Sequence, residues 1–231
     1  MKIHLFTYLY LLLALLVDYD SYVYFLLFSF LHEIGHCLMA CFLKFEINRL
    51  VVLPFGAFLS LNDFGKHQVI EEILVVITGP IVNLIMMLIL YDTFLAKINL
   101  FILVFNLLPI YPLDGSKLLL LVLSYFVDYY CCFKIQIYVS CLMLLGLWFV
   151  VDDVGSYILL VYLSYNMFKY LKVYRYILYS IVINDHKDKG RYKINEKLSY
   201  YRPYLNVYKI NEKLYSLEEM KIYLIKSYKS N

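Results

Sequence analysis

One stretch of the sequence carries residues that can bind a metal ion and activate water. His32, Glu33 and His36 form the pattern His-Glu-x-x-His. Two histidines four residues apart lie on one face of a helix, so both can bind one Zn²⁺ ion, and the glutamate is placed to take a proton from zinc-bound water. Zinc makes hydroxide available at neutral pH. The motif therefore predicts zinc-dependent hydrolysis, with Glu33 as the general base.

The surroundings of this motif strengthen that interpretation. It lies inside an apolar run over residues 21–43. A charged side chain in the middle of a bilayer costs roughly 2.5–3.5 kcal/mol on insertion scales, so buried charges there usually serve a function. A chance match, or a structural polar cluster, is the weaker alternative.

A catalytic zinc site needs a third protein ligand and an open position for water. Asp114 is the strongest candidate, because it lies in an apolar segment that Pro109, Pro112 and Gly115 interrupt. Broken helices at membrane depth tend to form binding sites, since their freed backbone groups line a cavity. The alternative is a proline-kinked loop in which Asp114 caps the next helical turn.

A third apolar segment, residues 68–91, carries several polar residues. The pair Gly79-Pro80 can thin or kink a helix and allow close packing. Asn83 is buried in the middle of the segment, where an interhelical hydrogen bond is a simpler explanation than a catalytic role. Glu71 and Glu72 begin the segment, and acids suit the N-terminus of a helix.

The composition places all of these residues in a membrane protein. The chain has 231 residues, 63% of them hydrophobic and 17% charged, and its mean hydropathy is +0.69. Soluble domains are about 45–50% apolar and about 25% charged. An ordinary soluble enzyme, a disordered chain and a nucleic-acid-binding module are therefore excluded. The apolar runs are too long for barrel strands, so we expect an all-α membrane protein.

The apolar runs predict about six transmembrane helices, and they divide the chain into a core and a tail. The connection 45–66 is apolar but too short to span, which favours a short membrane-associated β-hairpin or a re-entrant segment. The positive-inside rule places both termini and this connection in the cytoplasm. The predicted spans lie at about 3–17, 21–43, 68–91, 98–123, 135–151 and 154–171.

The charge changes sign near residue 171. Residues 1–171 hold 8 basic and 12 acidic residues, whereas residues 172–231 hold 13 and 6. We therefore expect a transmembrane core over 1–171, which carries the zinc-hydrolase motif, and a small, basic, Tyr-rich cytosolic tail over 172–231. The tail repeats the sequence Tyr-Lys-Ile-Asn-Glu-Lys-Leu at 192–198 and 208–214. Compositional bias is the simpler explanation, and a surface for anionic lipid or an acidic substrate is the functional one.

In combination, the motifs resemble the site-2 protease family of intramembrane zinc metalloproteases. The order is HEIGH in the second span, GPxxN from Gly79 to Asn83, and NLLPxxPLDG from Asn106 to Gly115. The resemblance covers about residues 20–125. Six spans and a modest size look most like the sporulation branch of the family, which cleaves a membrane-associated sigma-factor precursor at a bacterial inner membrane.

The resemblance implies one Zn²⁺ per chain, with His32, His36 and Asp114 as ligands and Glu33 as the catalytic base. It also implies a membrane-associated protein substrate, contact with the lipid bilayer and no nucleic acid, and it leaves inhibitory membrane partners open. The sporulation branch ends in a nucleotide-sensing domain that this tail does not resemble.

The resemblance also implies how substrate is received. Asn106, Pro109 and Pro112 shape the loop that takes an extended substrate, and the 50–60 hairpin can pair with that substrate as an added strand. Asn83 is a supporting residue. The alternatives are a non-catalytic zinc-binding membrane scaffold and a small transporter with a relay of buried His and Asp. The second lacks the internal symmetry expected of it.

Overall fold

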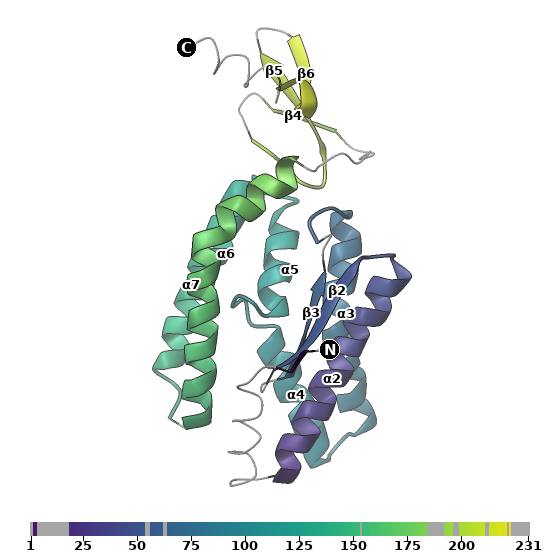
Figure 1. The fold of residues 1–231 in the computed structure, drawn as a ribbon, viewed down its shortest axis with the longest axis vertical. Coiled ribbons are helices and arrows are strands. Elements are labelled where there is room, and N and C mark those ends of the chain that lie inside the picture. Colours follow the sequence, from purple (N-terminus) through teal and green to yellow (C-terminus); the bar gives the residue numbers. More distant parts are fainter. Residues whose placement is uncertain are drawn as a thin grey trace.

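The computed structural model describes residues 2–3, 19–53, 56–61, 64–152, 154–183, 192–195, 199–210, 213–220 and 222. Helices make up most of this part, with one small sheet beside them and another in the tail (Figure 1). The helices are α2 (Tyr19–Phe42), α3 (Val69–Ile89), α4 (Phe94–Asn106), α5 (Asp114–Leu123), α6 (Tyr129–Trp148) and α7 (Val154–Ile183). The strands are β1 (Lys2–Ile3), β2 (Ile47–Leu53), β3 (Gly56–Leu61), β4 (Tyr192–Asn195), β5 (Leu205–Ile210) and β6 (Lys213–Ser216).

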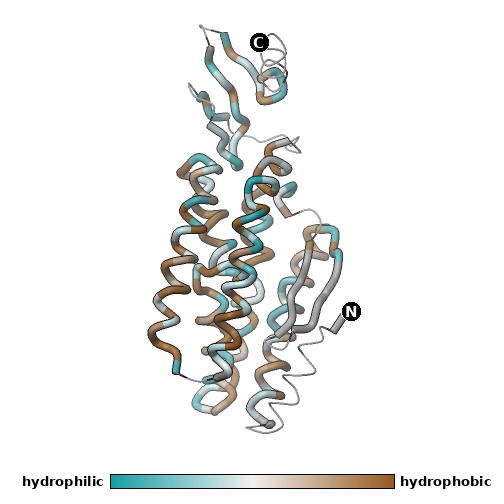
Figure 2. Tube along the Cα trace, turned by 60° about the vertical axis from the view of Figure 1, so that its left-hand side comes forward, coloured by the Kyte–Doolittle hydropathy of each residue, from teal (hydrophilic) through white to brown (hydrophobic). Residues whose placement is uncertain are grey.

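Three helices of the described part are long and apolar enough to cross a membrane, namely Ser21–Phe42 within α2, then α3 and α6. Figure 2 shows hydrophobic residues along these helices, whereas the tail mixes both kinds. Helix α4 is apolar but has only 13 residues. The predicted first span lies outside the described residues beyond Ile3, so the count of six spans stays a prediction.

Three predicted segments differ from the helices observed. The segment at 98–123 is two helices, α4 and α5, because Pro109 and Pro112 cannot continue a helix. Helix α6 begins at Tyr129 rather than near residue 135, because the Asp128 side chain accepts a hydrogen bond from the Tyr130 amide and caps it. Helix α7 continues past residue 171 to Ile183.

The connection after α2 is a β-hairpin, which was one of the two predicted alternatives. Strands β2 and β3 pair antiparallel, with Val51 opposite Phe58, and their aromatic and β-branched residues favour this conformation. Strand β1 pairs parallel to β2, with Lys2 opposite Val51. The hairpin lies alongside α2, and β3 contacts that helix (Figure 1).

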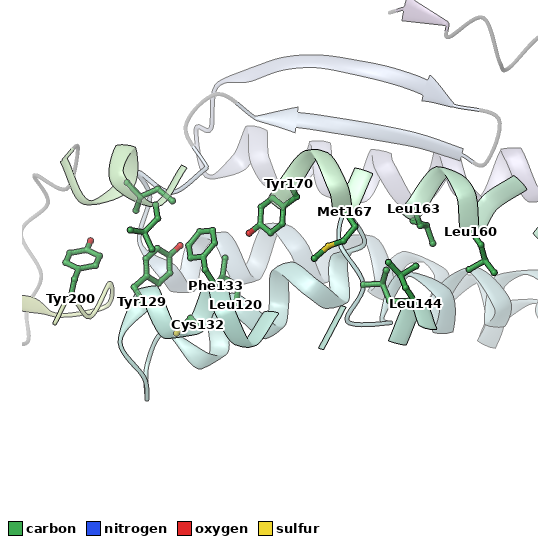
Figure 3. Close-up of a cluster of buried hydrophobic side chains, with 13 residues drawn as sticks. Leu120, Tyr129, Cys132, Phe133, Leu144, Leu160, Leu163, Met167, Tyr170 and Tyr200 are labelled. Atoms are coloured by element: carbon green, nitrogen blue, oxygen red, sulfur yellow. The ribbon is translucent and has the colours of Figure 1, made fainter. Parts of the chain in front are cut away.

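The helices pack in two groups. Helix α3 packs on α2, α4 and α5, whereas α6 packs on α5 and α7. The largest core lies between α6 and α7, and Figure 3 shows its side chains in a row that ends at Tyr129 and, from the tail, Tyr200. Helix α5 is therefore the element shared by both groups.

Three strands between residues 192 and 216 pair in a second small sheet. Strand β4 pairs parallel to β5, and β5 pairs antiparallel to β6. The two repeat copies take different structures. The first copy opens with β4, whereas the second closes β5 and opens β6.

Candidate metal centre

The two histidines of the motif lie on the face of α2 that packs on α3. His32 and His36 are both buried, and their rings meet edge to face with centroids 4.7 Å apart. Gly35 allows the close approach of the two helices, since a Cβ there would lie 3.1 Å from the Thr78 carbonyl oxygen and 2.7 Å from the Val82 side chain.

Asp114 joins the histidines from the first residue of α5. Its Oδ2 lies 3.0 Å from His32 Nε2 and 2.9 Å from His36 Nε2, and the two Nε2 atoms are 3.1 Å apart. Asp114 is buried, and no side-chain bond caps the helix that it begins. The helix-cap interpretation of Asp114 is therefore wrong, because the carboxylate faces the histidines.

The other nitrogen of each histidine meets a hydrogen-bond acceptor on α3. His36 Nδ1 lies 2.8 Å from the Val75 carbonyl oxygen, which can only accept, so Nδ1 carries the proton. His32 Nδ1 lies 2.6 Å from Asn83 Oδ1. A neutral imidazole has one N–H, so each Nε2 is left with a lone pair.

A chain of amides fixes the orientation of Asn83. Asn99 on α4 donates from Nδ2 to the Leu95 carbonyl oxygen (3.0 Å), and its Oδ1 therefore accepts from Asn83 Nδ2 (3.0 Å). Both asparagines are 0% exposed. Asn83 Oδ1 is thus held as the acceptor that His32 needs. The interhelical hydrogen bond expected of Asn83 exists, and the same side chain also contacts a histidine of the motif.

Gly79 gives the histidine rings their room. A Cβ at this position would lie 2.2 Å from His36 Nε2 and 2.8 Å from His32 Nε2. Any side chain here would occupy the space in which the two nitrogens meet. The Gly-Pro pair of α3 therefore permits close contact with the candidate metal ligands as well as with the helix backbone.

The two carboxylate oxygens of Asp114 have different partners. Oδ2 faces the histidines, whereas Oδ1 accepts a hydrogen bond from Lys117 Nζ at 2.9 Å. Lys117 lies one turn further along α5. Its side chain restrains the rotation of the carboxylate, so one oxygen remains directed at the histidines.

Polar residues of α6 and α7 hold the loop that leads to Asp114. Ser140 Oγ donates to the Pro109 carbonyl oxygen (3.0 Å) and accepts from the Tyr111 amide (3.2 Å). Gln136, one turn away on α6, donates to the Ser116 carbonyl oxygen at 3.0 Å.

Helix α7 completes this support. The Tyr170 hydroxyl donates to Gln136 Oε1 at 2.7 Å, and the Tyr170 ring stacks on Tyr111 with centroids 4.0 Å apart. The loop before α5 is therefore fixed from both its backbone and its side chains.

The arrangement suits a zinc ion. His32, His36 and Asp114 each offer one ligand atom, and these atoms lie within 4.8 Å of one another. A tetrahedral zinc ion with ligands at about 2.0–2.2 Å separates them by about 3.3–3.6 Å, so small outward shifts accommodate it. Three lone pairs converge here, and a cation is what such a cluster needs.

The remaining predicted residues lie around this cluster. Glu33 is half-buried on α2 and interacts electrostatically with His36, Asp114 and His32. Asn106 ends α4, and its amide donates to the Ile102 carbonyl oxygen at 3.1 Å. Pro109 and Pro112 lie partly buried in the loop before α5, with Pro112 in a cis peptide bond.

Several residues that support the cluster were not predicted from the sequence. Single polar residues in apolar helices form no pattern, and only their burial together reveals them. A count of polar residues in and beside the apolar runs would have included these positions, but would not have ranked them above other polar residues there. The residues missed are Asn99, Lys117, Gln136, Ser140 and Tyr170.

Comparison with known proteins assigns the family. Residues 21–95 match the family model described as peptidase family M50. The chain is 30% identical to stage IV sporulation protein FB of Bacillus subtilis over 214 residues, which cover 83% of this chain and 73% of the relative. It is also 30% identical over 109 residues to a zinc metalloprotease of Methanocaldococcus jannaschii, covering 41% of this chain and 31% of that protein.

A solved structure shares the fold. The site-2 protease from Methanocaldococcus jannaschii superposes with a TM-score of 0.55 at 22% sequence identity, covering 72% of this chain and 88% of that one. The apolar helices and these relatives identify a membrane protein, and the zinc metalloprotease relative together with the His/Asp cluster supports zinc. The chain belongs to peptidase family M50, the site-2 protease family of zinc metalloproteases.

Proposed function

We propose that this chain is an intramembrane zinc metalloendopeptidase that hydrolyses a peptide bond of a membrane-tethered protein. The observation that carries the proposal is the convergence of His32 Nε2, His36 Nε2 and Asp114 Oδ2, with both Nδ1 atoms engaged elsewhere. These three residues would hold one Zn²⁺ per chain. When bound, zinc supplies a Lewis acid that polarises the scissile carbonyl and acidifies water.

The chain's own residues supply the proton transfers and the positioning. Glu33 takes the proton of the attacking water and passes it to the leaving amine. Asn83 and the Val75 carbonyl hold the imidazoles in the tautomer that binds metal, and Lys117 holds the Asp114 carboxylate. A peptide must be extended to be attacked, so a helical substrate unwinds locally first.

Substrate binding is assigned to the loop and the hairpin. The stretch that includes Asn106, Pro109 and Pro112 lies directly before Asp114 in the chain, so a substrate on it is close to the metal centre. Strand β3 is an edge strand of its sheet in the described part of the chain, so its outer edge can pair with the backbone of an extended substrate. The likeness to the sporulation protein favours a membrane-associated sigma-factor precursor, at a bacterial inner membrane with both termini cytoplasmic.

The test is a zinc and cleavage assay on purified protein in detergent. Wild type should hold about one zinc and cut a single-span test protein. Glu33→Gln should keep zinc while kcat falls by about 10²–10⁴-fold, the range for general acid–base catalysis. Asp114→Asn should lose zinc. The matched controls are Glu46→Gln and Asp152→Asn, which change exposed acids outside the cluster.

Other outcomes would favour the alternatives. Zinc that is held without cleavage of any single-span protein in a broad panel would favour a non-catalytic scaffold. Zinc movement across reconstituted vesicles, unaffected by Glu33→Gln, would favour a transporter. Wild type without zinc, and with cleavage that Glu33→Gln leaves unchanged, would contradict the mechanism.

A further inference from the structure

The tail contacts the membrane core through a second cluster of buried polar residues. Arg202, 3% exposed, donates from Nη2 to Glu72 Oε1 on α3, and Glu72 is 0% exposed. The same Nη2 reaches the carbonyl oxygen of His67, just before α3, at 3.2 Å. Arg202 Nη1 lies 3.4 Å from the Tyr129 hydroxyl on α6. One guanidinium therefore contacts both α3 and α6, which do not pack closely on each other in the part of the chain that the structure describes.

Backbone bonds hold the tail to α6 beside this guanidinium. The Tyr200 amide donates to Asp128 Oδ1 at 2.6 Å, and the Tyr129 amide donates to the Tyr200 carbonyl oxygen at 2.8 Å. The Tyr200 ring packs on Tyr129 with centroids 6.0 Å apart (Figure 3). Asp128 thus caps α6 with one oxygen and binds the tail with the other.

Hydrogen bonds within the tail hold the segment that carries Tyr200 and Arg202 in one conformation. Asn206 donates to the carbonyl oxygens of Tyr201 and Tyr204, both at 3.0 Å, and accepts from the Tyr201 amide at 2.8 Å. Asn195, from the first repeat copy, donates to Asn206 Oδ1 at 3.2 Å. Both asparagines are buried, so residues 199–206 form a preshaped loop rather than a loose connection.

Glu72 depends on this loop for its charge partner. Its Oε1 also accepts from the Gly65 amide at 2.6 Å, whereas Oε2 has no hydrogen-bond partner in the described part of the chain. A buried carboxylate is costly without a cation. Arg202 is the cation that contacts it.

The helices that the loop joins also hold the two sides of the metal centre. Helix α3 supplies Val75 and Asn83 to the histidines, and α6 supplies Gln136 and Ser140 to the loop before Asp114. We propose that Arg202 is a positioning residue for the metal centre, and that residues 199–206 act as a clasp that fixes α3 relative to α6. Only the zinc and cleavage measurements of this proposal rest on the proposed function; the hydrogen-exchange measurement does not.

The test compares Arg202→Met with Arg175→Met, a control that changes an exposed arginine of α7. Hydrogen exchange in detergent should speed up by about tenfold or more over residues 64–76 and 199–206 in Arg202→Met alone. The zinc dissociation constant should rise by about tenfold, within the range for supporting residues of metal sites. In cleavage, kcat should fall while KM is unchanged, because the clasp does not touch substrate.

A second variant covers the case in which Arg202→Met does not fold. The double change Glu72→Met with Arg202→Met leaves no buried carboxylate without a partner, and it should still lose exchange protection over 199–206. Unchanged exchange and zinc affinity in both variants would overturn the proposal. If wild type neither binds zinc nor cleaves, yet exchange responds as expected, the proposed function fails and the clasp stands.

Discussion

The metal centre and the clasp both gather buried polar side chains from distant parts of the sequence, but their chemistry is opposite. In the metal centre, His32, His36 and Asp114 direct lone pairs at one point. In the clasp, the guanidinium of Arg202 donates to Glu72 and to a backbone oxygen. The metal centre therefore needs a bound cation, whereas the clasp already contains one, the guanidinium of Arg202.

A ligand site and a structural cluster can be told apart by their hydrogen-bond donors and acceptors. Burial alone does not distinguish them, since Asp114 and Glu72 are both buried acids. The balance of donors and acceptors does, because an excess of acceptors at one point is costly unless a cation binds there. Perturbations that supply or remove a cation should therefore affect the two clusters differently.

Metal removal should produce the largest effect. A chelator is expected to abolish cleavage and, relative to zinc at about 1,000 times its Kd, to lower the free energy of unfolding by about 4 kcal/mol. Exchange protection over residues 199–206 should persist, because the clasp holds its own cation. Cleavage and thermal unfolding, measured with and without added zinc, check this. Full activity in metal-free protein would contradict it.

A methyl group at Gly79 should damage the metal centre alone. Its Cβ would lie 2.2 Å from His36 Nε2, so Gly79→Ala must displace the ring. We expect the zinc dissociation constant to rise by about 100-fold, the upper end for changes beside metal ligands. Gly146→Ala is the matched control, because nothing lies within 4 Å of a Cβ there. That control should stabilise α6 by about 0.4–1 kcal/mol. Equal zinc affinities would refute the packing argument.

Loss of the hydrogen bond between Asn83 and Asn99 should have a smaller effect on zinc affinity. Asn99→Leu removes the acceptor of Asn83 Nδ2, so the Asn83 amide is free to turn its oxygen away from His32. Zinc affinity should fall by about tenfold, with KM unchanged. Asn166→Leu is the control, since Asn166 donates only to Tyr162 within α7 among the contacts described. Equal zinc affinities for Asn99→Leu and Asn166→Leu would mean that His32 keeps its tautomer without the hydrogen bond between Asn83 and Asn99.

Acidification should leave the clasp unchanged while it empties the metal centre. Burial opposes the charge of Arg202, but the Tyr129 hydroxyl and the Glu72 carboxylate hold its pKa above its ordinary value. The stability that this raised pKa contributes is therefore complete below the ordinary arginine pKa and is lost only at higher pH. Protons compete with zinc for histidine nitrogens.

The measurement is zinc content and exchange at about pH 7.5 and about pH 5.5, on either side of the ordinary histidine pKa. Zinc should be released at the lower pH, while protection of residues 199–206 stays constant. Parallel loss of both would show that the clusters are one cooperative unit.

Much of the His/Asp cluster was predictable from sequence, because residue type and short spacings mark its members. The spacing of His32 and His36 places them on one helix face, and prolines mark the loop before Asp114. The hairpin was predictable from its β-branched and aromatic residues. These features need no knowledge of tertiary contacts.

The supporting residues were not predictable, because their meaning comes from partners far along the chain. Glu71 and Glu72 both suit a helix N-terminus, yet Glu71 caps the amide of Gln68 at the surface while Glu72 is buried against Arg202. Gln136 looks like a lone polar residue in an apolar run until the Ser116 carbonyl oxygen and the Tyr170 hydroxyl are brought to it. In the sequence, nothing distinguishes Glu72 from its neighbour Glu71, and nothing shows that Gln136 has partners on other elements.

The distance between Glu72 and Arg202 along the chain has a consequence for biosynthesis. They are 130 residues apart, so a ribosome adding about 5–20 residues per second places α3 in the nascent chain on the order of ten seconds before its cation exists. During that interval Glu72 lacks the guanidinium that contacts it in the finished protein, and a buried carboxylate without a cation is costly. A chain released before Arg202 is added would keep this defect, and we expect it to be less stable than the chain that contains both residues.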